Sequence, residues 1–341
     1  MKQFLVIFIF VPFFLNAQIG GTSTYKFLDL TNSARIAALG GANVSIKDPN
    51  LIFNNPALMD SSTANQFNVS YVNYFAGISW GYSSYTFNPS KLGFFAVGIQ
   101  YVDYGKFIAT DEFGNITGEF EASDYVLSAA WAYNLDSFFT VGVVLKPIIS
   151  SYEIYNSFGI AADIGMTYFS RNKNFSAGLV FRNIGTQIKP YVEDNYEPLP
   201  FDIQVGISQK LAHAPFRFSV VAHHLNKPNL GYVIEEVGDN LQFNETQSKS
   251  KLAEYSDLFA RHFIISTELV PSENFYISFG FNYQRRQELK IATKTGLTGF
   301  SAGVGIKIKK FAFNYGIAKY HLAGSSHTFT MALNINQLFK R

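Results

Sequence analysis

The chain has 341 residues, a formal net charge of +2 and no cysteine. The near-neutral charge gives no support to nucleic-acid binding, which needs a basic face or arm. Aromatic residues make up 17% of the chain and charged residues only 15%, whereas charged residues make up about 25% of ordinary soluble domains. This composition indicates apolar surface that does not face water.

The first 17 residues have the pattern of a secretory signal peptide. Lys2 precedes an apolar run over residues 4–15, and Ala17 provides a small residue at the expected cleavage site. The run is shorter than the ~20 residues that a membrane-spanning helix needs. No other run is long and apolar enough to be one, so a mature chain that crosses a membrane must do so as a closed β-barrel.

Residues 18–62 are predicted to form an irregular N-terminal hatch. Turn formers such as Gly40-Gly41 and Asn54-Asn55-Pro56 interrupt regular structure here, yet the segment is also rich in apolar residues that require burial. The expected container is a barrel lumen, in which Arg35, Asp48, Asn54 and Asn55 would satisfy polar groups.

Residues 63–341 are predicted to form an all-β fold, a 14-stranded antiparallel transmembrane barrel. Large apolar residues alternate with Gly, Ser, Ala and Asn, as in residues 157–168, 275–284 and 299–308. The predicted strands are 66–75, 77–87, 92–104, 119–133, 138–155, 157–168, 174–183, 201–210, 216–225, 262–269, 275–284, 299–308, 311–321 and 326–336.

The connections between these strands alternate in length, although those near residues 75–77, 155–157 and 322–325 are short exceptions. Short ones follow the even-numbered strands, whereas residues 105–118, 184–200, 226–261 and 285–298 form long ones. Short periplasmic turns and longer surface loops are typical of outer-membrane barrels. A secreted sandwich or a propeller is the alternative, but a water-facing sheet would carry Lys, Glu and Thr rather than repeated Gly and Ala.

No motif predicts a catalytic, cofactor or metal site. Gly299–Gly303 matches the G-x-S-x-G nucleophile elbow, but that motif needs a strand-to-helix turn, and here the strand alternation continues through Ser301. His223 and His224 are expected on opposite faces of a strand, and surface or rim positions are expected for the histidines. We therefore expect a protein that is not an enzyme.

The connection 226–261 is the longest and most charged, with a short helix predicted near residues 250–259. Loops of this length are usually functional or disordered. With the N-terminus in the periplasm, strand parity puts this loop on the cell surface, where it is a candidate partner-binding site. Its candidate residues are Glu235, Glu236, Asp239, Lys249, Lys251, Glu254 and Asp257.

The hatch also carries a family resemblance. Residues 33–41 read SARIAALGG, and an N-P-A motif follows before the first strand. In these features the chain resembles the FadL-related barrel group of the Bacteroidota, specifically over residues 20–75 and generally elsewhere. The motif residues are Ser33, Ala34, Arg35, Gly40, Gly41, Asn55, Pro56 and Ala57.

The resemblance implies a 14-stranded barrel with its N-terminal segment inside the lumen. It further implies a non-enzymatic outer-membrane subunit of the type IX secretion system, with PorZ, PorU and PorV-like components as partners, alongside outer-membrane lipid and lipopolysaccharide. The alternative is a FadL-type transporter of a hydrophobic small molecule.

Overall fold

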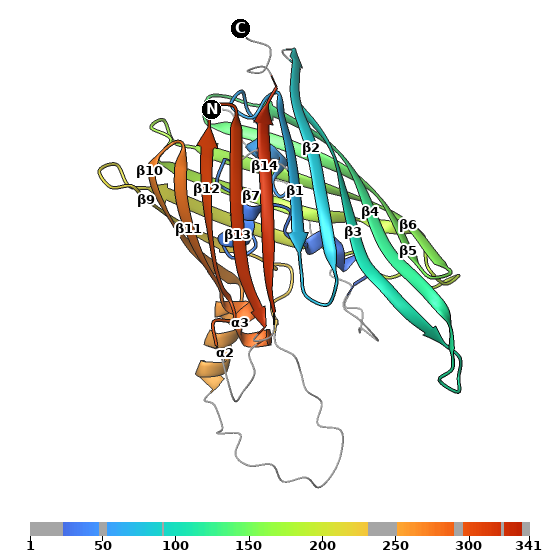
Figure 1. Cartoon of the computed structure of the whole chain (residues 1–341). Coiled ribbons are helices and arrows are strands. Elements are labelled where there is room, and N and C mark those ends of the chain that lie inside the picture. The colour runs from blue at the N-terminus through green and yellow to red at the C-terminus, as the bar shows by residue number, and fades with distance from the viewer. Residues whose placement is uncertain are drawn as a thin grey trace, which may run out of the picture.

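A closed barrel of fourteen antiparallel strands makes up most of the protein (Figure 1). The computed structural model describes residues 23–47, 53–90, 92–230, 251–289, 296–321 and 324–335. Each strand pairs with its neighbours in the chain, and β1 closes the barrel against β14. The strands are β1 (Gln66–Asn73), β2 (Ser79–Ser90), β3 (Gly93–Thr110), β4 (Ile116–Asn134), β5 (Phe139–Tyr152), β6 (Tyr155–Phe169), β7 (Phe175–Lys189), β8 (Asp202–Lys210), β9 (Phe216–Ala222), β10 (Phe263–Ser272), β11 (Phe275–Asn282), β12 (Phe300–Ile308), β13 (Phe311–His321) and β14 (Gly324–Asn334).

The two faces of the strands differ in chemistry as the alternation predicts. On β6, Ile164 and Met166 point outward and are exposed, whereas Asp163 and Thr167 point inward and are buried. A wall with an apolar outside and a polar inside is the arrangement of a membrane barrel. The predicted 14-stranded antiparallel barrel is thus confirmed.

All connections at one end of the barrel are short, whereas the other end has both long connections and short ones, such as those of β1–β2 and β5–β6. We call the first of these the short-turn end. Its connections are residues 91–92, 135–138, 170–174, 211–215, 273–274 and 309–310. The opposite, long-loop end carries α2 (Lys251–Ala260) and α3 (Tyr283–Leu289), which lie together beyond the strands in Figure 1. Helix α2 agrees with the helix predicted near residues 250–259. Helix α3 lies in a connection for which the sequence predicts no helix.

One predicted loop, residues 105–118, is mostly strand. β3 and β4 continue beyond the rest of the barrel as a hairpin whose turn is residues 111–115. Phe107 stacks on Phe120 with ring centroids 5.2 Å apart, and Lys106 faces Glu121 across the hairpin. Cross-strand aromatic and charge pairs stabilise such an extension. The sequence predicts a loop here because Gly105 and Gly118, which lie within β3 and β4, are residues typical of turns.

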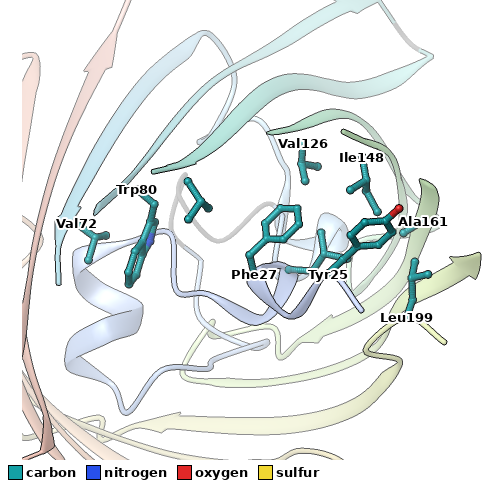
Figure 2. Packing of buried hydrophobic residues seen from close by; sticks show 10 residues of the cluster. Tyr25, Phe27, Val72, Trp80, Val126, Ile148, Ala161 and Leu199 are labelled. Atoms are coloured by element: carbon teal, nitrogen blue, oxygen red, sulfur yellow. The ribbon is translucent and has the colours of Figure 1, made fainter. Parts of the chain in front are cut away.

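The described residues of the N-terminal segment include the short helical elements η1 (Lys26–Asp29), α1 (Ala34–Ala38) and η3 (Pro56–Leu58). Figure 2 shows Tyr25 and Phe27 within the ring of strands, where they pack with the inward side chains Val126 and Ile148. The predicted signal peptide and Asp48 lie outside the described residues. None of the helices in the described residues has the length and hydropathy needed to cross a membrane.

Candidate functional site in the barrel lumen

A buried carboxylate on the barrel wall binds an arginine of the N-terminal segment. Arg35 donates from Nε to Oε1 of Glu268 at 2.8 Å and from Nη2 to Oε2 at 3.0 Å. Arg217 donates to Oε2 at 2.9 Å, and Ser278 donates to Oε1 at 3.0 Å. Because Glu268 is fully buried, these bonds offset the large cost of removing its charge from water.

Glu268 and Arg217 are site residues that the sequence analysis missed. Both lie on the inward face of their strands, β10 and β9. A single Glu among the small residues of an inward face is the signal that could have identified this position. The sequence alone does not reveal that its partner is Arg35, 233 residues away.

Helix α1 lies against the strands that close the barrel. The Ala34 N–H donates to Oγ1 of Thr330 on β14 at 3.0 Å. After the helix, Gly40 and Gly41 adopt φ angles of 96° and 104°, which favour glycine. A Cβ on Gly40 would lie 2.5 Å from Cγ2 of Ile264, so the close approach to β10 also requires glycine. The hydroxyl oxygen of Ser33 is buried and has no hydrogen-bond partner among the described residues.

The N-P-A motif forms a second contact with the wall. The Asn55 side chain donates to the Val44 carbonyl at 2.8 Å and accepts from the Ala57 N–H at 3.1 Å. It thus caps η3, in which Pro56 occupies the first turn. The Ala57 carbonyl accepts a 2.7 Å hydrogen bond from Thr167 on β6.

Glycines on the inward face let the segment approach the wall at backbone distance. A Cβ on Gly142 would lie 2.7 Å from the Pro56 carbonyl carbon. A Cβ on Gly165 would overlap the Asn55 side chain, and one on Gly178 would overlap the Val44 carbonyl. The small residues of the strands therefore match the shape of the segment.

A second buried ion pair lies within the barrel wall near η1. Lys146 lies 2.7 Å from the Asp163 carboxylate and donates to Oδ1 of Asn183 at 2.8 Å. Arg182 donates to the Leu28 carbonyl at 3.0 Å. Asn183 of β7 also donates to Oδ1 of Asp29 at 3.4 Å, so the segment is held by β7 as well as by β10.

Two sequence expectations about histidine are wrong. His223 and His262 are buried, and His262 Nδ1 lies 2.9 Å from the His223 carbonyl oxygen. The rings of His223 and His224 are 4.7 Å apart rather than on opposite faces. The alternation ends because β9 stops at Ala222 and His224 adopts a φ of 54°.

Ser301 lies within β12, as expected, and donates to the Ala38 carbonyl at 2.9 Å. It therefore supports α1 rather than occupying a nucleophile elbow. No group of three or more His, Asp or Glu side chains in the described ranges is placed to hold a metal ion.

The predicted partner-binding loop is described only at its two ends, residues 226–230 and 251–261. Glu235, Glu236, Asp239 and Lys249 lie outside the described residues, and Lys251 and Glu254 belong to α2. Asp257 accepts from Tyr283 of α3 at 2.7 Å and pairs with Arg261 at 2.8 Å. Its carboxylate thus joins α2 to α3.

Polar cavities lie on both sides of α1. One of about 720 Å³ is at the short-turn end and includes Arg35 in its lining. One of about 220 Å³ is towards the long-loop end and includes Gly41 and Arg285. Arg35 lies in α1, and Gly41 follows the end of this helix. Since each lines a different cavity, the N-terminal segment lies between the two cavities.

An apolar groove of about 380 Å³ lies on the outer wall over β1, β12, β13 and β14. Its apolar lining residues are Val69, Tyr71, Val304, Ile306, Phe313, Tyr315, Phe329 and Met331. It also reaches Asn314 and Thr330, and Thr330 is one of the inward residues that bind the N-terminal segment. The groove therefore lies over the part of the wall whose inner face binds the N-terminal segment.

No protein-family model and no curated protein matches this chain. Solved structures share its architecture. The toluene transporter TodX of Pseudomonas putida is similar with a TM-score of 0.55 and 13% identity, over 90% of this chain and 99% of that one. The toluene transporter TbuX of Ralstonia pickettii is similar with a TM-score of 0.50 and 14% identity, over 90% and 98%. The chain thus shares the fold of these structures, as a closed antiparallel barrel of fourteen strands.

Proposed function

We propose that this protein is a FadL-type barrel of the bacterial outer membrane that passes a hydrophobic small molecule. The observation that carries the proposal is the closed 14-stranded barrel, whose architecture over nine-tenths of the chain is that of two proteins described as toluene transporters. The proposed role is transport rather than catalysis.

The proposed location is supported by the outer face of the barrel. Its strands expose aliphatic and aromatic side chains such as Leu127, Ile207 and Phe279. A continuous apolar outer wall is stable only against lipid. The predicted signal peptide over residues 1–17 provides the route across the inner membrane.

We propose that residues 18–62 are a hatch that closes the lumen. The Arg35–Glu268 ion pair joins the segment to the wall. The Lys146–Asp163 ion pair is buried in the wall beside the segment. A hydrophobic molecule would therefore not pass straight through the charged lumen. The outer groove beside Thr330 is the apolar surface through which it could leave the wall for the membrane.

Uptake of labelled toluene by cells with and without the gene tests this proposal. Met331→Trp fills the groove and is expected to reduce uptake severalfold. Met166→Trp is the matched control, because Met166 is an outward methionine of almost equal exposure on β6, at 38% against 37%. Equal uptake in the deletion strain and the wild type contradicts transport.

A second candidate is a docking subunit of the type IX secretion system. The sequence of residues 25–30, YKFLDL, and that of Asn43-Val44-Ser45 resemble PorQ more than PorV. Helix α2 supports docking independently, because Leu252, Tyr255 and Phe259 are exposed at 79%, 70% and 67% on one face. The proposed partners are PorZ, PorU and PorV-like components, in a complex that attaches cargo to lipopolysaccharide.

A pull-down of the tagged protein from outer membranes distinguishes this candidate. Replacing Leu252, Tyr255 and Phe259 with serine is expected to remove the partners and to release cargo into the medium. The control is Ile116→Ser on the exposed β3–β4 hairpin. The outward residues Leu127, Ile207 and Phe279 are not used as controls because in the proposed location their side chains face lipid. Unchanged cargo attachment after deletion of residues 226–261 contradicts docking by this loop.

A further inference from the structure

The cavity at the short-turn end is strongly basic. The described residues that line it include one carboxylate, that of Glu273. We name this cavity the basic vestibule, and its basic residues are Arg35, Lys47, Lys173, Lys210, Arg217, Lys307 and Lys310. At about 720 Å³ it has the size of a ligand-binding cleft.

Some of these charges are balanced within the protein, and others are not. Arg35 and Arg217 pair with Glu268, and Lys47 pairs with Asp60. In the described part of the chain no ion pair joins a carboxylate to the four remaining lysines, which are Lys173, Lys210, Lys307 and Lys310. A cleft lined by charge of one sign concentrates its field and attracts counter-charge.

We propose that the basic vestibule binds an acidic polypeptide segment of a periplasmic partner. The inference goes beyond transport and uses only the proposed outer-membrane orientation, in which short turns face the periplasm. Binding to an acidic segment would neutralise these four lysines together.

The placement of the cations favours a peptide over a compact phosphate. The four lysines come from separate elements, the β6–β7 turn, the end of β8, β12 and the β12–β13 turn, so the charges surround the mouth. Both arginine forks, the groups best matched to phosphate, are already engaged by Glu268. Side-chain amides that line the same cavity add hydrogen-bonding groups of the kind that a peptide backbone binds, and they are those of Gln66, Asn172, Asn174, Asn274 and Asn314.

The experiment measures binding of a fluorescent deca-glutamate peptide to the full chain in a neutral detergent. We compare wild type with the triple variant Lys210→Gln, Lys307→Gln, Lys310→Gln. The control triple variant is Lys106→Gln, Lys189→Gln, Lys309→Gln, which changes net charge equally. Its lysines are exposed and do not line the vestibule, and Lys309 is the direct neighbour of Lys310.

Binding is expected to weaken about tenfold or more in the vestibule variant and less than about twofold in the control, and to fall as salt shortens the screening length. Absence of binding at low salt overturns the proposal, as does equal weakening by both variants. Binding of inorganic tripolyphosphate or lipopolysaccharide micelles that depends on the three lysines, without peptide binding, also overturns it in favour of a phosphate ligand. Since no outcome involves toluene uptake, this proposal and the transport proposal can fail separately.

Discussion

Arg35 and Glu268 join the N-terminal segment to the barrel wall through two parallel hydrogen bonds of 2.8 and 3.0 Å. This bidentate geometry is the strongest form of an arginine–carboxylate pair. Arg217 binds the same carboxylate from the neighbouring strand. Loss of Glu268 would leave two guanidinium groups facing each other inside the lumen.

Replacing Glu268 with Gln is therefore expected to release the segment. Breaking a buried pair by removal of one partner costs about 3–5 kcal/mol, and a part of that cost corresponds to at least about tenfold faster opening. The chain has no cysteine, so Ser33→Cys places a single thiol on the buried segment. Its rate of labelling by a membrane-impermeant maleimide measures the opening.

Glu119→Gln provides the matched control for that substitution. Glu119 also pairs with a basic residue, Lys106, but both side chains are more than half exposed. Exposed pairs contribute little, so the labelling rate should stay at the wild-type value. Equal rates in the two variants would show that the Glu268 cluster does not hold the segment.

Gly178→Ala tests the close approach of the segment to β7. The added Cβ would overlap the Val44 carbonyl oxygen, and overpacking of this kind costs about 1–3 kcal/mol. Gly81→Ala on β2 is the control, because the nearest atom to its Cβ would be 3.8 Å away. Thermal unfolding in detergent should show a lower Tm for Gly178→Ala only, and a lower Tm for both would point to a general intolerance of the strands.

The Lys47–Asp60 pair gives the segment a pH dependence. Burial alone would raise the pKa of Asp60, but its bonds to Lys47 and Ser62 outweigh burial and lower the pKa below the usual 3.8. Because the folded-state pKa is depressed, the stabilisation is complete above the unfolded value and is lost as the pH falls through the folded value.

Asp60→Asn should consequently speed labelling of the Ser33→Cys reporter at pH 7. At a pH below the folded-state pKa, where the wild-type carboxyl is protonated too, the two proteins should label alike. Pyridyl disulfide probes, which remain reactive towards thiols in acid, make this comparison possible. A constant difference at all pH values would exclude the pair as the titrating contact.

Tyr283→Phe should loosen α2 from α3. The Tyr283 hydroxyl donates to Asp257 at 2.7 Å, and a hydrogen bond to a charged group contributes about 1.5–3 kcal/mol. Amide hydrogen exchange over residues 251–260 should accelerate. The control, Tyr255→Phe, removes a hydroxyl from an exposed position on α2 itself and should leave the exchange of residues 251–260 unchanged.

The alternation along the strands determines the barrel at the level of sequence. Large apolar residues alternate with Gly and Ser along each strand, and this alternation specifies which face of the strand points outward. The short connections that follow the even-numbered strands identify one end of the barrel. The extra length of β3 and β4 is not predictable in this way, because Gly105 and Gly118 look like turn residues when their cross-strand partners are unknown.

The motif residues are identifiable from sequence, but their tasks come from pairing across the closed barrel. Local pattern explains why Asn55 caps η3 and why Gly40 ends α1. It does not specify that Arg35 meets Glu268, or that four lysines from the β6–β8 and β12–β13 regions line one cavity. Such contacts depend on barrel closure, which brings together residues separated by more than 200 positions, and a hydrophobic pattern with a range of a few residues carries no information about that register.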